Sequence, residues 1–391
     1  MRLAFVYRNL NRSGSLERDS VFLLEGLAAR GVDVHCYCDP GTSVDVEGVV
    51  RHDIVPLTRS RSRLGFPLLR ASFAARATKA LRADRDRYDL IHALGVSAWE
   101  HDVIHVPAVM AAEQARWPER AGRGHRAAGA RAKLAPLLRP EVAAVRTIER
   151  LQFRPGRYQH TTVVTEQVRD DLMRVHGVSA DRIEVIPPAV DVARFAGAKD
   201  GRLRQELAIE PERGVILFIG HSFERKGLAD AVAALARSGT DAHLVVVGEG
   251  EGDSSAYRRK ADALGVGGRV HFTGPVDSPE DYYAAADLLV LPTRSDPWGI
   301  PVIEAMAAGV PVVTTAAAGS ASVAERAGAA VLVPARSPER LAAAIGELLA
   351  DPDRRREMGE RGQAEAGRFD ISSVVDATLD VYERSLAEKR A

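Results

Sequence analysis

The sequence of 391 residues predicts an α/β protein with two domains, each built on an open parallel sheet. Apolar segments of strand length alternate with segments of helical spacing along most of the chain, as in sheets covered by helices. The chain is also longer than one typical domain. Pro187-Pro188 interrupts the alternation near the middle. We therefore expect the link between the domains near residues 187–200.

The composition is ordinary for a globular protein, with 46% apolar and 27% charged residues. The N-terminal segment MRLAFVYRNLNRSG lacks the apolar core of a signal peptide. No run of about 18 apolar residues predicts a membrane span. We therefore expect a cytoplasmic protein. Cys36 and Cys38 are the only cysteines and alternate on one predicted strand, so we expect buried thiols and no metal site.

The first domain is expected over residues 1–190 and begins with a strand at Leu3–Tyr7. Loops that follow parallel strands bind ligands at the carboxyl edge of a sheet. Gly14 lies in the first such loop, where it permits close backbone approach, and Asp19 lies near the start of the next helix. His101 and His105 lie where a strand meets a loop, a position that can host acid or base chemistry, although for either one alone a structural role is the favoured interpretation.

Residues 59–157 contain 20 Lys and Arg but only 9 Asp and Glu. This excess favours an anionic acceptor or peripheral contact with a membrane, although a solvated arginine-rich face explains it equally well. The segment Arg59–Leu81 is amphipathic and could lie on a membrane surface, but Gly65 and Pro67 interrupt its pattern and favour packing onto its own domain. No feature of the sequence predicts a nucleic-acid partner.

The second domain is expected over residues 191–370, where five apolar strands alternate with helices. A final helix within residues 371–391 is free to cross back to the first domain. The predicted strands are Val215–Ile219, Leu244–Gly248, Val270–Gly274, Leu288–Pro292 and Val310–Thr315.

The first constellation of the second domain is HSFERKG, residues 221–227, between a strand and a helix. Arg225 and Lys226 should lie at the ligand-binding edge of the sheet, where adjacent cations suit a diphosphate. A helix start is electrostatically unfavourable for cations, which supports a functional role over two ordinary surface charges. His221 precedes them in the same loop.

The second constellation lies between Thr293 and Gly319, where a strand, a polar turn, a helix and another strand follow without spare residues. Asp296 begins the turn and Gly299 ends it, and Pro301 fits the first helical position, where its missing N–H costs nothing. Glu304 lies in the first turn of that helix. Backbone donors at a helix start attract phosphate, and carboxylates beside them suit sugar hydroxyls. The alternative is a turn-forming aspartate and a glutamate that only complements the helix dipole.

Two nucleotide-binding patterns are absent. GEGEG at residues 248–252 contains two acids and is not followed by Lys-Ser or Lys-Thr, which excludes an NTPase loop. The turn between the first strand and helix lacks the glycine-rich dinucleotide fingerprint, which argues against an NAD-dependent enzyme.

These residues resemble the family 4 retaining glycosyltransferases of the GT-B fold, and most closely the branch that contains the lipopolysaccharide-core glucosyltransferase. The resemblance covers nearly the whole chain and implies two Rossmann-like domains that face each other across a cleft. The matching segments are SGSLERD at 13–19, RTIERLQF at 146–153, IEVIPPAVD at 183–191, FERKG at 223–227, AAADLLVLP at 284–292 and DPWGIPVIEAMAAGVPVVTT at 296–315.

The resemblance also implies roles for single residues. Asp296 would contact the transferred sugar and Glu304 the nucleotide ribose, while Arg225 and Lys226 would neutralise the donor diphosphate. Gly14 would approach the donor phosphate and the acceptor. Asp296 is one methylene shorter than the Glu usual in the family. We therefore expect the hexose to be bound in a different position or to be a different sugar.

The resemblance also bears on three histidines and on three further donor-binding residues. His221 stands where many members carry their first basic residue, and His105 and His101 are both candidates for the histidine of the first domain. Gly299, Ile300 and Asp19 complete the expected donor-binding set.

The implied activity is metal-independent transfer of a hexose from a nucleotide diphosphate sugar, with uridine as the expected nucleotide and with retention of configuration. No cofactor is expected. The acceptor is open: a phosphorylated or lipid-linked glycan and a small natural product all fit. The alternatives are a sugar-nucleotide epimerase or a phosphorylase of the same fold, or a two-domain binding protein without catalysis.

Overall fold

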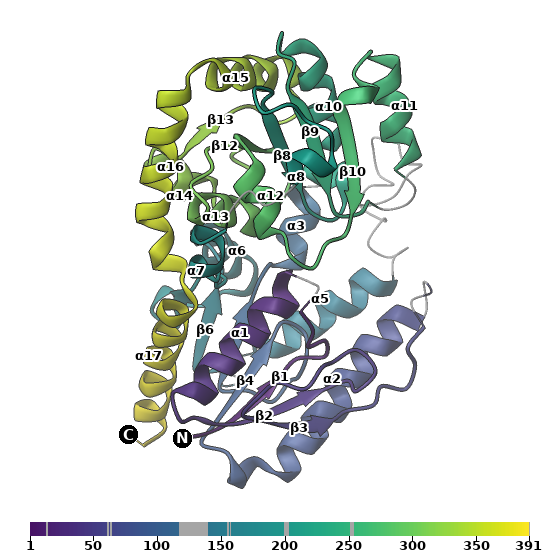
Figure 1. Cartoon of the computed structure of the whole chain (residues 1–391). Helices are drawn as coiled ribbons and strands as arrows, with labels where there is room; N and C mark the ends of the chain where they lie inside the picture. Colours follow the sequence, from purple (N-terminus) through teal and green to yellow (C-terminus); the bar gives the residue numbers. More distant parts are fainter. Residues whose placement is uncertain are drawn as a thin grey trace. The chain divides into compact units, whose positions relative to one another are not determined.

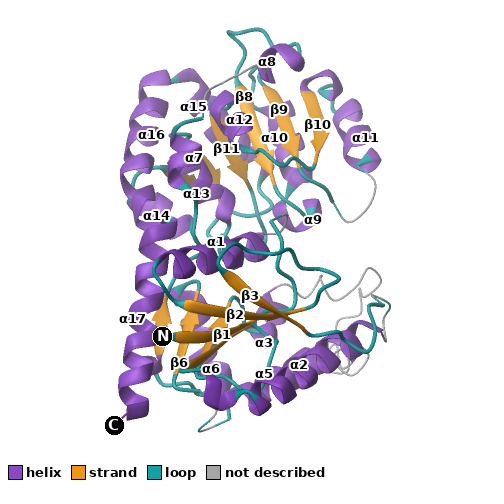
Figure 2. Ribbon diagram, turned by 60° about the horizontal axis from the view of Figure 1, so that its bottom comes forward, coloured by secondary structure: helices purple, strands orange, loops and turns teal. Residues whose placement is uncertain are grey.

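The computed structural model describes residues 1–12, 15–60, 62, 65–116, 140–154, 156, 158–198, 203–250 and 254–390. It forms two compact units. Met1–Ala189 and Ile371–Ala391 make up the first, and Val190–Asp370 make up the second. Each unit is one parallel sheet between layers of helices (Figures 1 and 2). The predicted α/β fold class is confirmed.

The sheet of the first unit has the strand order β3-β2-β1-β4-β5-β6-β7, and every neighbouring pair is parallel. Helices cover both faces, so the central strands β1 and β4 are almost completely buried and apolar. The strands are β1 (Arg2–Val6), β2 (Asp33–Cys38), β3 (Val49–Asp53), β4 (Leu90–Leu94), β5 (Val103–Val106), β6 (His160–Val163) and β7 (Ile183–Val185). Both cysteines are buried free thiols of β2.

The final helix of the chain, α17, belongs to the first unit and packs against α1. A Cβ at Gly26 of α1 would collide with Val375 of α17, so this close packing requires glycine. Tyr382 of α17 is fully buried beside His92 of β4. The helices of this unit are α1 (Ser15–Ala29), α2 (Gly65–Ala83), α3 (Met110–Arg116), α5 (Pro140–Gln152), α6 (Glu166–His176) and α17 (Ile371–Arg390), with short 3₁₀ turns at Arg85–Arg87 and Ala180–Arg182.

The sheet of the second unit has the strand order β10-β9-β8-β11-β12-β13, again parallel throughout. One apolar core packs α13 against this sheet, and another packs α10 and α15 against it. The strands are β8 (Val215–Ile219), β9 (His243–Val247), β10 (Val270–Gly274), β11 (Leu288–Leu291), β12 (Val312–Thr314) and β13 (Ala330–Leu332).

Helices of the second unit pack on both faces of this sheet. They are α7 (Val192–Ala196), α8 (Leu203–Glu206), α9 (Phe223–Lys226), α10 (Leu228–Arg237), α11 (Ser255–Ala263), α12 (Glu280–Ala285), α13 (Ile300–Ala307), α14 (Ala321–Arg326), α15 (Pro338–Ala350) and α16 (Pro352–Ala366), with 3₁₀ turns at Gly267–Arg269 and Gly367–Phe369.

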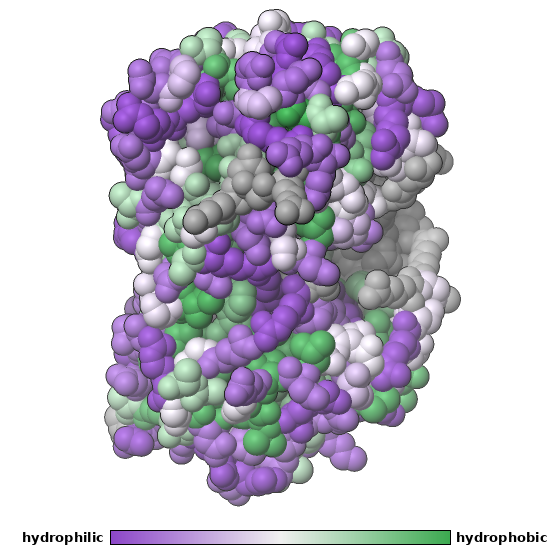
Figure 3. Space-filling view, viewed as in Figure 1, coloured by the Kyte–Doolittle hydropathy of each residue, from purple (hydrophilic) through white to green (hydrophobic). Residues whose placement is uncertain are grey.

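The amphipathic segment of the first unit forms α2, which buries its apolar face in its own unit through Leu69, Phe73 and Ala77. Leu68 on the same helix and Leu57 in the preceding loop remain at least half exposed. The visible surface mixes hydrophilic and hydrophobic side chains (Figure 3). Within the described ranges, no helix has the length and apolar character needed to cross a bilayer.

Candidate functional site

Arg225 and Lys226 lie in α9, a single helical turn that follows β8 at the carboxyl edge of the second sheet. Gly227 ends this turn with a positive φ of 82°. A Cβ at Gly227 would collide with the carbonyl oxygen of Pro292, so the close approach of α9 to the end of β11 requires glycine. The Arg294 N–H donates to the Arg225 carbonyl at 2.9 Å, which holds the two loops together.

The turn from Asp296 to Gly299 is bound to the loop that follows β12. The Asp296 N–H donates to the Ala317 carbonyl at 2.9 Å, and the Ser320 N–H donates to the Trp298 carbonyl at 2.7 Å. Gly299 has a φ of 87° and directs the chain into α13. These bonds fix the backbone of the turn from which the Asp296 side chain extends.

One carboxylate lies between the two cations. The Lys226 ammonium donates to Oδ2 of Asp296, and a terminal nitrogen of Arg225 lies 3.6 Å from the same oxygen. Arg225 also donates to the Ser295 carbonyl at 2.7 Å. Lys226 is only 5% exposed. The two cations thus share the carboxylate of Asp296.

The pKa values follow from this arrangement. Burial lowers the pKa of Lys226, and the charge of Asp296 opposes that shift. Burial acts to raise the pKa of Asp296, but the charges of Lys226 and Arg225 outweigh it, and the net pKa lies below its ordinary value. Asp296 is therefore ionised at neutral pH. Charges in such a poorly hydrated place interact strongly with a charged ligand.

Glu304 lies in α13 and is 3% exposed. Its Oε2 accepts a hydrogen bond of 2.7 Å from the hydroxyl of Tyr283 in α12. The charge of Glu304 also acts on Lys226, which places the two groups in one electrostatic cluster. Gly299 and Ile300 are both buried at the start of α13. The structure thus brings Arg225, Lys226, Asp296 and Glu304 together at one sheet edge.

Tyr283 was not predicted from the sequence. It is 21 residues from Glu304 and comes from a different helix. Its neighbours in the segment EDYYAA carry no local pattern that indicates a contact with α13. Only the packing of α12 and α13 on the same sheet face reveals it.

Besides His101 and His105, two predicted residues belong to the first unit. Gly14 lies outside the described residues. Asp19 of α1 accepts a hydrogen bond of 2.6 Å from the Ala189 N–H within the same unit. Burial raises the pKa of Asp19 to about 7, although that hydrogen bond and the charge of Arg18 act to lower it. The observed contact of Asp19 is with the end of its own unit.

The three histidines lie in different surroundings. His105 is buried in β5, with Nδ1 2.9 Å from the hydroxyl of Thr162, and burial lowers its pKa to about 4. His101 is buried just before β5. The side chain of His221 is 53% exposed and lies 4.0 Å from the carboxylate of Glu249. His221 is the most accessible of the three.

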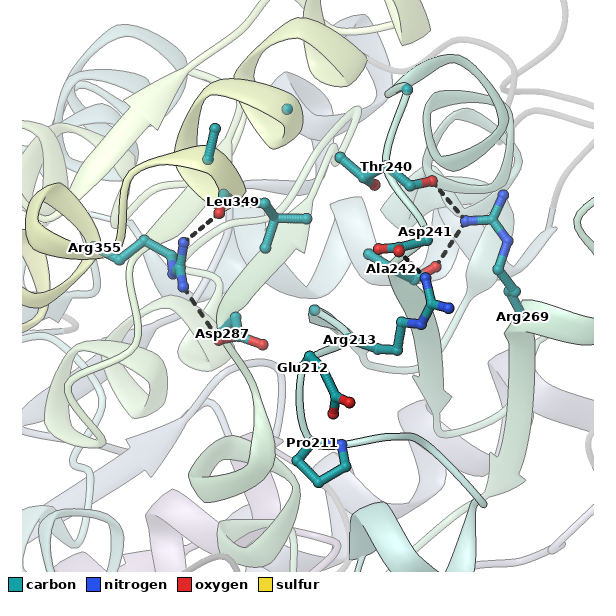
Figure 4. Close-up of a pocket in the computed structure, with 14 residues that line it drawn as sticks. Pro211, Glu212, Arg213, Thr240, Asp241, Ala242, Arg269, Asp287, Leu349 and Arg355 are labelled. Atoms are coloured by element: carbon teal, nitrogen blue, oxygen red, sulfur yellow. Dashed lines mark hydrogen bonds and ion pairs between the residues drawn. The ribbon is translucent and has the colours of Figure 1, made fainter.

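A cavity of about 750 Å³ lies at the opposite edge of the second sheet, where β8 to β11 begin (Figure 4). Its arginines already have partners. Arg213 pairs with Asp241, and Arg269 donates to the Thr240 carbonyl at 2.9 Å. Arg355 donates to carbonyl groups at the end of α15. These cations stabilise the loops and leave no excess charge for a ligand.

A second cavity, of about 240 Å³, lies in the first unit at the carboxyl ends of β1, β4 and β5. Glu149 and Gln152 of α5 line it. Both belong to RTIERLQF, one of the segments that carry the family resemblance. The resemblance implies no role for either residue. The location is one where parallel α/β sheets bind ligands.

Comparisons with known proteins agree with this geometry. Residues 17–194 match the profile described as Glycosyltransferase Family 4, and residues 200–365 match Glycosyl transferases group 1. A D-inositol 3-phosphate glycosyltransferase of Segniliparus rotundus is 30% identical over 383 residues, which cover 92% of this chain and 82% of that protein. The chain belongs to glycosyltransferase family 4.

Other family members align over shorter regions. The D-inositol 3-phosphate glycosyltransferase 2 of Catenulispora acidiphila is 32% identical over 240 residues, which span 58% of this chain and 56% of that protein. The matched region is thus about half the length of that relative.

Solved structures share the fold. The structure of WaaG, a glycosyltransferase involved in lipopolysaccharide biosynthesis, has a TM-score of 0.79 and 23% identity over 97% of this chain and 99% of its own. Sucrose-phosphate synthase from Thermosynechococcus elongatus has a TM-score of 0.76 and 21% identity over 99% of both chains. The GT-B fold is therefore confirmed.

Proposed function

We propose that this family 4 member is a retaining glycosyltransferase that moves a hexose from a UDP-sugar to an acceptor hydroxyl. The observation that carries the proposal is a pair of cations, the buried Lys226 and the partly buried Arg225, beside Asp296 and Glu304 at the carboxyl edge of the second sheet. Fixed cations suit a diphosphate, and ionised carboxylates accept hydrogen bonds from sugar hydroxyls.

A uridine nucleotide is supported by proteins of the same fold. Anabaena HepE was solved in complex with UDP and in complex with UDP and glucose. Both structures have a TM-score of 0.72 and 17% identity over 98% of this chain and 100% of their own. We extend that nucleotide to this chain as part of the proposal.

The proposed reaction breaks the bond between the anomeric carbon and the donor diphosphate. The acceptor oxygen bonds to the same face of that carbon, and its proton passes to the departing diphosphate. Arg225, Lys226 and the start of α13 would stabilise the negative charge that develops on the leaving group. No nucleophile from the protein and no metal ion or cofactor takes part in this proposal.

The carboxylates have separate roles in the proposal. Asp296, fixed by its backbone bonds to the loop after β12, would contact the hexose. Glu304 would bind the ribose hydroxyls, because the hydrogen bond from Tyr283 holds its side chain in one orientation. Held in place before the donor arrives, Glu304 would bind it at a lower entropic cost.

Replacement of Lys226 by Ala tests the proposal. It removes a charge that would stabilise the leaving diphosphate, so transfer should slow at least about 100-fold, which corresponds to about 3 kcal/mol. A mass-spectrometric assay with UDP-, GDP- and dTDP-sugars and a mixed set of acceptors measures the transfer. NMR of the product gives its anomeric configuration.

Lys260→Ala, on α11 of the same unit, is the matched control and should leave transfer unchanged. Circular dichroism should show that both variants are folded. A folded Lys226→Ala protein with the turnover of the wild type would contradict the role assigned to the cations.

A further inference from the structure

The chain passes between its two units twice, and the two crossings are bonded to each other. The first crossing is residues 189–190 and the second is residues 370–371. Within the second unit, Val190 and Asp370 form a parallel bridge, and the Val190 N–H donates to the Phe369 carbonyl at 2.8 Å. A shift of Phe369 would therefore displace both crossings together.

The first crossing is also held on the side of the first unit. The Ala189 N–H donates to Oδ1 of Asp19 at 2.6 Å, and Asp19 is buried near the start of α1. Ala189 itself belongs to an apolar core that includes residues of α1 and α17. The crossing is thus packed and hydrogen-bonded, so a displacement of Val190 is not absorbed by a loose linker.

One aromatic contact joins the crossings to the turn that carries Asp296. Phe369 lies in the 3₁₀ turn that follows α16, and its ring packs against the indole of Trp298. The ring centroids are 5.6 Å apart and the ring planes meet at 51°. Phe369 is 6% exposed and Trp298 is 7% exposed, and both belong to the apolar core around α13. Paired rings in such a core contribute stability beyond the area that they bury.

Packing, and not a polar bond, positions the indole of Trp298. Its Nε1 is shielded from solvent and has no hydrogen-bond partner among the residues that the structure describes. The backbone of the same residue is fixed, because its carbonyl accepts hydrogen bonds from the N–H and the hydroxyl of Ser320 at 2.7 and 2.8 Å. A buried N–H without an acceptor is unfavourable. The indole is therefore held by its contacts with the core, and Phe369 supplies the aromatic one.

We propose that Trp298 and Phe369 are positioning residues that couple donor binding to the two crossings. A donor diphosphate would compete with Asp296 for Lys226, and the turn that responds also carries Trp298. A shift of the indole would change its contact with Phe369, whose carbonyl is bonded to Val190. Tightly packed cores change between discrete arrangements, so a small shift in the turn can reach the crossings. The inference rests on the proposed donor site and gives these two residues a role that requires no contact with the donor.

Coupling of this kind is reciprocal. If bound UDP makes the crossings open less often, closed crossings raise the affinity for UDP by the same factor. The amide groups of Ala189 and Val190 are both hydrogen-bonded, so their hydrogen exchange reports how often the first crossing opens. Calorimetry of UDP binding reports the other half of the same coupling.

Hydrogen exchange of the full chain with and without saturating UDP is the first test. In the wild type, UDP should slow exchange in the peptide that contains Ala189 and Val190 at least about fivefold. Phe369→Leu keeps an apolar side chain but removes the ring. This variant should still bind UDP, with an affinity lower by the same factor of about five, and UDP should no longer slow exchange at the crossing.

A double-mutant cycle assigns the effect to the contact between the two rings. Trp298→Leu should weaken UDP binding and remove the effect of UDP on exchange, as Phe369→Leu does, so either single variant tests the coupling if the other does not fold. The double variant should bind UDP about as tightly as either single variant, because one lost contact cannot be lost again. Losses of affinity that add in the double variant would contradict the coupling.

Phe272→Leu is the matched control, since it removes a partly buried ring of β10 that packs on the other core of the same unit. It should keep the UDP affinity of the wild type and the effect of UDP on the crossing. Circular dichroism should show that every variant is folded.

The wild type separates the two proposals. If it binds UDP but exchange at the crossing is unchanged, or is slowed equally in Phe369→Leu, the coupling is overturned and the proposed function stands. If UDP fails to bind the wild type, the proposed function and the coupling both fail.

Discussion

Asp296 is the residue whose chemistry is most specific to this chain. Its carboxylate is bonded to Lys226 and lies 3.6 Å from Arg225. A donor diphosphate would need the same two cations. The two cations cannot pair fully with the Asp296 carboxylate and with the diphosphate at the same time. The diphosphate would therefore either share Lys226 with Asp296 or displace the Asp296 carboxylate from Lys226. Displacement would free Asp296 to contact the transferred sugar.

Asp296→Asn tests this competition. Asn removes the competing charge but keeps nearly the same shape, so UDP should bind at least about threefold more tightly. Transfer should nevertheless slow, because the sugar would lose an ionised hydrogen-bond acceptor. Calorimetry with UDP and the transfer assay measure the two effects. Weaker UDP binding by a folded Asn variant would show that Asp296 helps to hold the nucleotide.

The sequence predicted some of these residues and not others, for a physical reason. Arg225, Lys226, Asp296 and Glu304 lie on the segments that follow β8 and β11, and parallel strands bring their carboxyl ends to one edge. Tyr283 reaches Glu304 through packing between two helices that are distant in sequence.

The α9 element shows how a single glycine can change a helix. The sequence predicted one helix from Gly227 onward, but the structure has a separate turn over Phe223–Lys226 before α10. Gly227 adopts the left-handed conformation between them, a position that only glycine fills without collision. The break turns Arg225 and Lys226 toward the edge of the sheet.

The strands of the first unit contain buried histidines beside α17. Nδ1 of His92 in β4 lies 2.6 Å from the hydroxyl of Tyr382. Burial lowers the pKa of His92, and the charges of His105 and His101 lower it further. Burial also lowers the pKa of His105 to about 4. These imidazoles are neutral in the folded protein at neutral pH.

Acid should therefore destabilise the first unit through His105. The unfolded state binds a proton below its ordinary pKa of about 6.5, whereas the folded state resists protonation until about pH 4. The contribution of His105 to stability is complete above pH 6.5 and is lost as the pH falls through that window. Between pH 7.5 and pH 5, the loss should be about 2 kcal/mol.

Denaturant unfolding of the wild type and His105→Asn at both pH values measures this loss. Asn cannot titrate, so the variant should lose less stability than the wild type over the same interval. Equal losses in the two proteins would show that His105 does not resist protonation in the folded state.

At the scale of the whole molecule, the alternation of strands and helices predicted both parallel sheets and their ligand-binding edges. The volume of a cavity could not be predicted, because it depends on side chains from several elements at once. The cavity at the amino edge of the second sheet is the larger of the two, yet its arginines are paired. Position at the carboxyl edge of a parallel sheet identifies a ligand site better than volume does.

The central claim is that a nucleotide diphosphate binds at the carboxyl edge of the second sheet. Calorimetric titration of UDP into the full chain and into Glu304→Ala tests it most directly, with Glu212→Ala at the opposite edge as the control. Loss of a charge-assisted bond to the ribose should weaken UDP binding at least about tenfold in Glu304→Ala only. Equal UDP affinity in folded Glu304→Ala and wild-type protein would contradict the account.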